Sequence, residues 1–318
     1  MAFSPLMLKL VACLRSTLQA EPTVIELGNQ TFKPRTHMLP RVGRWLSAEG
    51  VPHDAGALGK LASLPVEERP PHTATFYRAL GFASYDAIDV NARFGSLRMD
   101  LNQDLRIEYG FDRTFDLVTN NGTGEHVFDQ RAVLANVHSL AKPGLGAPGG
   151  VMLHVLPFFN WLNHGFYGFH PLLFVELAAA NGYELLRLSI ASNRGREARV
   201  TLPGVEAGRA VTRDDARAPA LSLAAFGARA SVAPGRALRG SVLRWPGRAS
   251  ARGRARGAGA ELEAALRWVT AEHPHVSVVA ALRRRGDAPF AIPLQGLYSG
   301  ANVDSPEIRA RYAPREAR

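Results

Sequence analysis

Acidic side chains stand near the ends of two short apolar segments, where they could bind a ligand. In Val24 to Leu27 the acid is Glu26, and Gly28 follows. Because glycine has no Cβ, a turn at Gly28 could approach a ligand closely. Asp89 stands near the end of Tyr85 to Val90, where a carboxylate can accept both hydroxyls of a ribose. The pattern is typical of parallel strands whose carboxyl edge binds a ligand, although a plain turn at Gly28 and a strand-end cap at Asp89 would need none.

A polar loop follows a third apolar segment and contains a histidine. An imidazole titrates near neutral pH, so His126 could act as a general base. The alternative is a structural histidine that packs against the strand edge. The candidates that this loop offers are Asn120, Asn121, Thr123, Glu125 and His126.

The stretch from Pro157 to Pro171 is rich in aromatic residues, histidine and glycine, and it follows another apolar segment. In open α/β sheets, ligands bind beyond the carboxyl ends of the strands. Aromatic walls with a few polar groups are typical of small-molecule pockets. His164 and Tyr167 are therefore the first candidates for substrate contact, and His170 is the third. The alternative is an aromatic plug that closes the core.

A metal site is not expected from the sequence. His154, His164 and His170 could be considered as ligands, but their spacing matches no strong zinc pattern. The single cysteine, Cys13, excludes an internal disulfide framework and an all-cysteine metal site, and it suits a reducing cytoplasm. Leu6 to Leu14 is too short to span a bilayer and is interrupted by Lys9, so it is predicted to be an amphipathic helix.

Apolar runs and helical spacing alternate along the chain, which predicts an α/β fold. Strands are expected at 24–27, 85–90, 114–119, 151–156, 183–190 and 275–282, with another strand end at 99–101. Helices are expected at 128–140, 172–181 and 261–270, and Gly182 should end the second of these.

Taken in order, these segments resemble the class I S-adenosylmethionine-dependent methyltransferases over about residues 20–190, plus a final strand near 275–283. The series that carries the resemblance is Glu26-Leu27-Gly28, Asp89, Asp100, Glu125-His126-Val127 and Lys142-Pro143-Gly144. The resemblance implies a Rossmann-like, mostly parallel sheet with an antiparallel last strand and helices on both faces. It also implies S-adenosyl-L-methionine as the cofactor.

The resemblance assigns roles to individual residues. Glu26 and Gly28 would lie near the methionine end of the cofactor, and Asp89 would bind its ribose. Asp100 and the backbone amide of Leu101 would bind the adenine. Asn120 would lie beside the transferable methyl group, and the catalytic candidates are His126, His164 and Tyr167.

One departure from the family concerns the first turn. It reads Gly28-Asn29-Gln30, so the usual second glycine is missing. This departure favours an alternative in which a methyltransferase-like fold has lost its cofactor and serves as a scaffold or interaction module. A second alternative, an NAD-dependent oxidoreductase, would require a G-x-G-x-x-G turn that is absent here. Walker-type and G-x-S-x-G motifs are absent too, which disfavours nucleotide and ester hydrolysis.

The predicted domain consists of residues 1–192 and 261–298, in which 33–82 is a proline-rich insertion or lid. Residues 193–260 form a basic insertion rich in Arg, Ala, Gly and Pro, in which short strands are expected only at 221–223 and 241–243, and 299–318 form a tail. From 194 to 260 there are 14 arginines, no lysine and 4 acids, which accounts for the whole formal net charge of +10. This composition fits either a disordered insertion or an anion-binding surface.

The expected reaction is transfer of a methyl group to an oxygen or nitrogen of a small-molecule or glycan-type acceptor, in the cytoplasm. The basic segment lacks lysine and interleaved aromatic residues, which disfavours nucleic acid as the partner. The sequence indicates neither the identity of the acceptor nor an oligomeric state.

Overall fold

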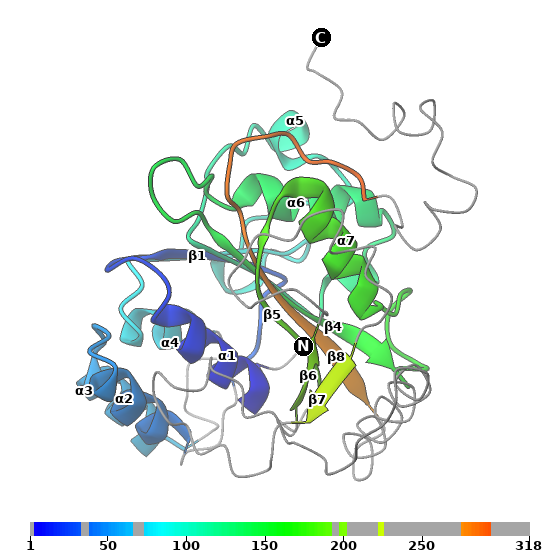
Figure 1. The fold of residues 1–318 in the computed structure, drawn as a ribbon. Coiled ribbons are helices and arrows are strands. Elements are labelled where there is room, and N and C mark those ends of the chain that lie inside the picture. The colour runs from blue at the N-terminus through cyan, green and yellow to red at the C-terminus, as the bar shows by residue number, and fades with distance from the viewer. Residues whose placement is uncertain are drawn as a thin grey trace, which may run out of the picture.

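The computed structural model describes residues 3–32, 38–65, 73–192, 197–201, 222–225 and 275–293. These residues form one eight-stranded sheet with the order β2-β1-β3-β4-β8-β5-β6-β7 (Figure 1). The strands are β1 Thr23–Leu27, β2 Ser84–Ile88, β3 Leu117–Asn121, β4 Val151–Phe159, β5 Glu184–Ser192, β6 Glu197–Thr201, β7 Ser222–Ala225 and β8 Val276–Arg283.

The first four strands are parallel, and the rest of the sheet is antiparallel. β1 pairs with β2 and β3, and β3 pairs with β4, each in parallel. β8 lies between β4 and β5 and is antiparallel to both. A late antiparallel strand at this place is the arrangement that the resemblance implied, so the predicted fold class is confirmed. β6 and β7 extend the sheet beyond β5.

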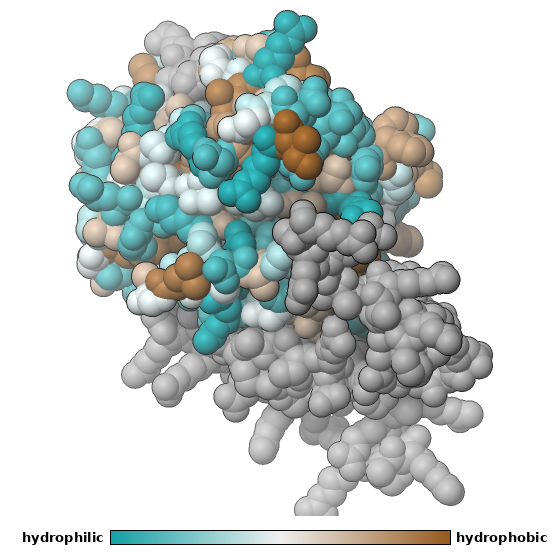
Figure 2. All heavy atoms as spheres, turned by 90° about the horizontal axis from the view of Figure 1, so that it is seen from above, coloured by the Kyte–Doolittle hydropathy of each residue, from teal (hydrophilic) through white to brown (hydrophobic). Residues whose placement is uncertain are grey.

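Two helical layers cover the two faces of the sheet (Figure 1). One face packs against α1 Pro5–Arg15, α2 Met38–Ala48, α3 Ala55–Ser63 and α4 Ala74–Ala79; the other packs against α5 Leu105–Tyr109, α6 Gln130–Leu140 and α7 Pro171–Asn181. The side of the molecule that carries α5 is mostly hydrophilic with scattered apolar side chains (Figure 2).

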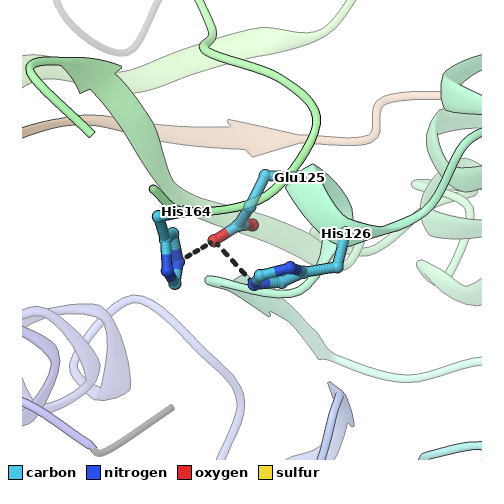
Figure 3. Close-up of side chains that lie close together, drawn as sticks. All are labelled: Glu125, His126 and His164. Carbon is cyan, nitrogen blue, oxygen red and sulfur yellow. Dashed lines mark hydrogen bonds and ion pairs between the residues drawn. The ribbon is translucent and has the colours of Figure 1, made fainter. Parts of the chain in front are cut away.

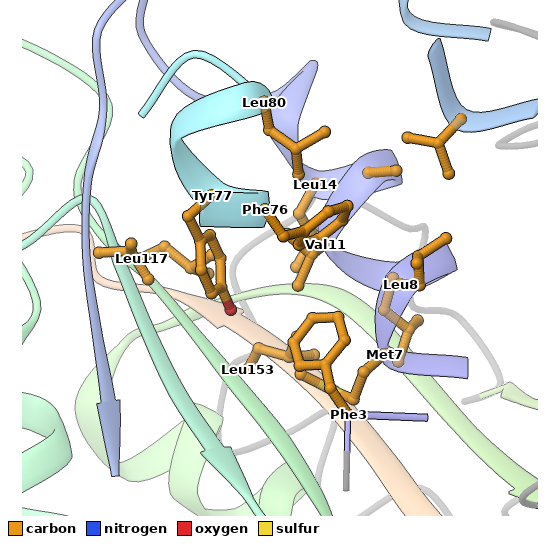
Figure 4. Packing of buried hydrophobic residues seen from close by; sticks show 14 of the residues in the cluster. Phe3, Met7, Leu8, Val11, Leu14, Phe76, Tyr77, Leu80, Leu117 and Leu153 are labelled. Carbon is orange, nitrogen blue, oxygen red and sulfur yellow. The ribbon is translucent and has the colours of Figure 1, made fainter. Parts of the chain in front are cut away.

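Alternation along the buried strands builds both cores. In β1, Val24 faces the α1–α4 layer, whereas Ile25 faces the α6–α7 layer. Figure 4 shows how side chains of α1 and α4 meet Leu117 and Leu153 of the sheet. Period-2 alternation with both faces apolar is what a parallel sheet covered by helices requires. Glu26, between two apolar neighbours, is therefore carried into the α1–α4 core.

Local signals in the sequence set the ends of the helices. The Ser4 side chain accepts a hydrogen bond from the Met7 amide, and Pro5 follows it, as is common at a helix start. α6 begins two residues later than predicted, because the Asp129 side chain accepts from the Ala132 amide and caps the helix there. α7 ends at Gly182, whose φ of 64° few other residues adopt, as the sequence predicts.

The proline-rich segment 33–82 contributes to the core. In its described residues, α2, α3 and α4 bury apolar side chains that include Leu39, Leu46, Leu61, Phe76 and Tyr77. It thus forms a layer of the fold, and its role as a lid stays a prediction. The predicted strand end at 99–101 is not a strand; Leu97 alone forms a bridge with Ile88.

Several sequence predictions lie outside the described residues: the helix at 261–270, a short strand at 241–243 and the tail at 299–318. Another short strand expected at 221–223 is present as β7, shifted by one residue. Across the described ranges, the structure contains no helix long and apolar enough to cross a membrane.

Candidate functional site

The candidate residues gather at the carboxyl edge of β1, β2, β3 and β4. β1 lies between β2 and β3. The chain therefore passes from β1 to the strand on one side, β2, and then crosses to the strand on the other side, β3. Such a switch point leaves a crevice in which open α/β sheets bind ligands. The glycine turn, the Asp89 turn and the loops that follow β3 and β4 all meet this edge.

Asp89 and Asn29 join the turn after β2 to the turn after β1. Oδ2 of Asp89 accepts a hydrogen bond of 3.1 Å from the Asn29 amide, and Oδ1 accepts one of 3.2 Å from the Asn91 amide. The Asn29 side chain donates to the carbonyl of Arg93 at 2.6 Å. The side-chain oxygen of Asn29, Oδ1, is buried without a hydrogen-bond partner. Buried polar atoms usually have a partner, so this oxygen is a free acceptor next to the predicted ribose acid.

Gly28 has a φ of 75° and lies against Thr123. A Cβ built on Gly28 would overlap Oγ1 of Thr123, which donates a hydrogen bond of 2.6 Å to the Leu27 carbonyl. The structure therefore explains the glycine by two requirements, the positive φ and the closeness of Thr123. Contact of the Gly28 backbone with a cofactor stays a prediction.

Gln30, which replaces the usual second glycine, joins β1 to β3. Its Nε2 donates to the Asn121 carbonyl at 2.9 Å, and the Asn121 side-chain amide donates to Oε1 of Gln30 at 3.1 Å. Both side chains are buried. The position at which the resembled family usually has its second glycine thus carries a buried, hydrogen-bonded side chain.

Glu26 is buried within the α1–α4 layer, and its carboxylate is bound by hydroxyl groups. It accepts hydrogen bonds from Thr73 at 2.6 Å, Tyr77 at 2.9 Å and Tyr85 at 3.0 Å. Burial raises the pKa of Glu26 to about 7, although these three hydroxyl groups act in the opposite direction. The observed partners tie β1 to α4 and β2, and a cofactor contact of Glu26 stays a prediction.

Asp100 and Leu101 lie in the loop after β2. Oδ1 of Asp100 accepts from the backbone and side-chain amides of Asn102, and the Asp100 amide donates to the Tyr109 hydroxyl at 3.0 Å. The Leu101 side chain is buried in the core on the α6–α7 face. Their predicted contacts with adenine are not tested by these bonds.

Asn120 shapes the turn that follows β3. Its Oδ1 accepts a hydrogen bond of 2.9 Å from the Gly124 amide, and its Nδ2 lies 3.4 Å from Nδ1 of His154. His154 is fully buried and packs on Phe174, and burial lowers its pKa to about 4. The geometry thus gives Asn120 and His154 structural partners, whereas contact of Asn120 with a cofactor stays a prediction.

Three chemically active side chains meet where the loops after β3 and β4 come together. Oε1 of Glu125 lies 3.1 Å from Nε2 of His164 and 3.8 Å from Nε2 of His126. The two imidazole rings lie edge to face, with centroids 4.7 Å apart. Figure 3 shows the Glu125 carboxylate between the two rings, one from each loop. The three residues are called the Glu-His-His cluster below.

The loop after β4 is held directly on Glu125. The Phe166 amide donates to the Glu125 carbonyl at 2.7 Å, and a Cβ on Gly165 would lie 2.7 Å from Cγ of Glu125. Glycine is needed there for this approach and for its φ of 69°. Trp161 packs 4.9 Å from the His164 ring and donates from Nε1 to the Val276 carbonyl at 2.9 Å, which braces the loop against β8.

Burial controls the protonation of the cluster. Glu125 is fully buried, and burial raises its pKa, while its contact with His164 acts in the opposite direction. Burial also lowers the pKa of His126, with a further contribution from His164. His126 is half exposed, so solvent reaches the cluster from its side.

Tyr167 and His170 have local partners. The Tyr167 hydroxyl donates to the Phe128 carbonyl at 2.9 Å and so ties the loop after β4 to the loop after β3. The Phe128 and Phe166 rings lie beside Tyr167 and are mostly exposed, and they form an aromatic border on the two loops that carry the cluster. Nδ1 of His170 accepts from the Leu172 amide and caps α7. The structure does not group His154, His164 and His170; among the described residues, the cluster that could hold a metal is Glu125, His126 and His164.

The residues at this edge fit the nucleoside half of S-adenosylmethionine better than its amino-acid half. Asp89 and the unpartnered Asn29 Oδ1 are acceptors that ribose hydroxyls could use. At the other half, Gln30 and Thr123 cover the turn through which the family approaches the methionine. The sequence did not indicate Asn29, because only the fold brings its side chain to Asp89 and Arg93.

Known proteins resemble this chain only distantly. No protein-family model matches the sequence, and no curated protein matches it. Solved structures similar to this chain include an inferred methyltransferase from Bacillus halodurans C-125, with 9% identity, a TM-score of 0.35 and coverage of 87% of this chain and 98% of that chain. Another is StiE O-MT, residues 961–1257, with 9% identity, a TM-score of 0.31 and coverage of 87% and 73%. Both TM-scores are low, so the assignment rests on the strand order: the chain has the class I methyltransferase-like fold.

Proposed function

We propose that this protein transfers a methyl group from S-adenosyl-L-methionine to an oxygen or nitrogen of a small-molecule or glycan-type acceptor. The observation that carries the proposal is the contact between Thr123 and Gly28. Asn29 directly follows Gly28 in the chain and donates a hydrogen bond to Asp89. Glu125 follows two residues after Thr123. The nucleoside-binding edge and the proton-accepting cluster of this proposal would thereby lie at the same edge of the sheet.

The cofactor would be held by residues of the nucleoside edge. Asp89 would accept the ribose hydroxyls with the help of Asn29 Oδ1, and Asp100 and the Leu101 amide would bind the adenine. When bound, the cofactor supplies an electrophilic methyl group on a sulfonium. The fold would bring the two reactants together, which is the main contribution that a protein makes to a displacement of this kind.

The Glu-His-His cluster would receive the acceptor. His164 would accept the proton of an acceptor hydroxyl at Nδ1, and Glu125, whose Oε1 lies 3.1 Å from the other ring nitrogen, Nε2, would stabilise the resulting imidazolium. His126 lies at the exposed side and would contact the acceptor as it enters. Tyr167 would position the loop through its bond to the Phe128 carbonyl.

The aromatic border favours an acceptor with an apolar face. Phe128 is 73% exposed and Phe166 is 69% exposed, and their rings meet edge to face with centroids 6.2 Å apart. Exposed aromatic rings next to polar groups can pack against a planar ring or the apolar face of a sugar. Both acceptor types of the proposal have such a face.

Thermal unfolding with different ligands separates this function from its two alternatives. A ligand at about 100 times its dissociation constant stabilises the native state by about 2.7 kcal/mol if it binds that state alone. S-adenosylhomocysteine should raise the melting temperature by several degrees, and NAD should not. A rise with NAD alone would favour the oxidoreductase. No rise with either ligand would favour the scaffold, which the Gln30–Asn121 pair at the glycine turn supports.

A further inference from the structure

We infer that the Glu-His-His cluster is a binding site for one divalent transition-metal cation. The three residues each offer a ligand atom within 4.8 Å of the others, and we take Oε1 of Glu125, Nε2 of His126 and Nε2 of His164 as the proposed ligands. Metal–ligand distances of about 2.0–2.2 Å place two ligand atoms on one tetrahedral cation roughly 3.4 Å apart. The observed separations from Oε1 of Glu125 to the two nitrogens, 3.1 and 3.8 Å, bracket that value.

The second oxygen of Glu125 independently supports a cation at this site. The Glu125 side chain is fully buried, and its Oε2 has no hydrogen-bond partner. A buried carboxylate with an unpaired oxygen is costly, because it loses hydration without an equivalent interaction. Figure 3 shows this carboxylate aimed between the two imidazole rings. A dication between the three side chains would compensate the buried charge.

The donor set selects the class of metal. Two imidazoles and one carboxylate suit Zn²⁺, Fe²⁺ and related first-row cations. Mg²⁺ and Ca²⁺ prefer oxygen ligands throughout, so they fit less well. Three protein ligands also leave at least one coordination position open, as in catalytic rather than structural zinc sites. The half-exposed His126 leaves that position accessible from solvent.

The surroundings of the ligands are rigid in the way that a metal site requires. Glu125 and His126 belong to the 3₁₀ turn Gly124–His126, whose start is held by Asn120. The loop bearing His164 is fixed by the Phe166 amide on the Glu125 carbonyl and by Trp161 on β8. Such supporting contacts orient metal ligands and strengthen binding.

The cation would change how the site activates an acceptor. His164 Nε2 either carries a proton that it shares with Glu125 or binds the metal, so proton and cation compete for one atom. A hydroxyl on the open position of the cation would lose its proton more readily, because the metal stabilises the oxyanion. This use of the cation rests on the proposed methyl transfer, whereas the binding of the cation does not.

Calorimetric titration of the tag-free, chelator-treated protein with ZnCl₂ tests the site, with CoCl₂ as a spectroscopic probe. We expect one equivalent of Zn²⁺ to bind with micromolar or tighter affinity, and Co²⁺ to give visible bands of a nitrogen-containing site. Affinity should fall at least tenfold in Glu125→Gln and His126→Ala. Because His126 is half exposed, its variant should fold, which circular dichroism can verify.

His53→Ala is the matched control, since His53 contacts Ser47 and Val51 away from the cluster. It should bind Zn²⁺ as the wild type does. Absence of binding by the wild type, or equal affinity in the wild type and both cluster variants, would overturn the inference. S-adenosylhomocysteine binding is measured separately, so a failure of the metal site and a failure of the methyltransferase function give different results.

Discussion

Oγ1 of Thr123 occupies the space where a Cβ of residue 28 would lie, so Thr123 and Gly28 are fitted to each other. The same hydroxyl donates to the Leu27 carbonyl at 2.6 Å. This pair joins the end of β1 to the loop after β3. It therefore sets the distance between the predicted nucleoside edge and the Glu-His-His cluster.

Gly28→Ala should destabilise the protein by about 3 kcal/mol, because it adds the strain of a positive φ to a steric overlap with Thr123. In a Thr123→Gly background the overlap is absent, and the same substitution should cost only about 1 kcal/mol. Urea unfolding of the four proteins in this double-mutant cycle measures the difference. Equal costs in both backgrounds would show that Thr123 does not require the glycine.

Glu26 predicts an unusual pH dependence of stability. Burial raises its pKa from 4.5 to about 7, so between these values the native state holds a proton that the unfolded chain has lost. The stabilisation is fully present below pH 4.5 and is lost as the pH rises through 7. Glu26→Gln has no such titration, so its unfolding free energy relative to wild type should increase by on the order of 3 kcal/mol from pH 4.5 to 8.

Chemical unfolding of Glu26→Gln and wild type across this pH range measures the effect, and Glu21→Gln is the control. Glu21 is exposed, so its variant should follow the wild type at every pH. A constant difference between Glu26→Gln and wild type would contradict the protonation of Glu26 in the native state.

The sequence predicted the fold more fully than the site. Apolar runs identified six of the eight strands, β1 to β5 and β8, because strands buried on both faces are apolar throughout. The predicted ends of α6 and α7 differ from the observed ends by two residues at most. Asp129 caps the start of α6, and Gly182 ends α7. β6 was missed, because Glu197–Thr201 carries charged residues whose pairing depends on β5.

Within the site, the sequence named His126 and His164 but could not show that they meet. They are 38 positions apart in the chain, and only the pairing of β3 with β4 brings their loops together. Glu125 was one of five candidates in its loop, and its burial is a property of the tertiary structure. The partners of Glu26 depend on α4, which the prolines of the segment 33–82 concealed.

Glu125→Gln should stabilise the metal-free protein by about 1 kcal/mol at pH 8, because it removes a buried charge with an unpaired oxygen. Burial raises the pKa of Glu125, so the difference should shrink as the pH falls and the wild-type carboxyl becomes protonated. Urea unfolding in the presence of a chelator measures it. A variant less stable than the wild type at pH 8 would indicate that the carboxylate serves the fold and not a ligand.

Tyr183→Phe should cost about 1–2 kcal/mol, because it leaves a buried nitrogen of His138 without a donor. The Tyr183 hydroxyl lies 2.6 Å from Nδ1 of His138, whose Nε2 donates to the Ala288 carbonyl at 3.0 Å. Tyr167→Phe removes a more exposed hydrogen bond, so it should lower the free energy of unfolding by no more than about 0.5 kcal/mol. Similar losses in the two variants on thermal unfolding would contradict this assignment.

The most direct measurement is calorimetric titration of the wild type, Asp89→Ala and Asp86→Ala with S-adenosylhomocysteine. Asp86 lies on β2, the strand that Asp89 follows, and its carboxylate forms a partly exposed ion pair with Arg113, so its loss should leave binding unchanged. We predict micromolar binding by the wild type and by Asp86→Ala, and a loss of at least tenfold in Asp89→Ala. No binding by a well-folded wild type would contradict the methyltransferase function and leave the scaffold as the better account.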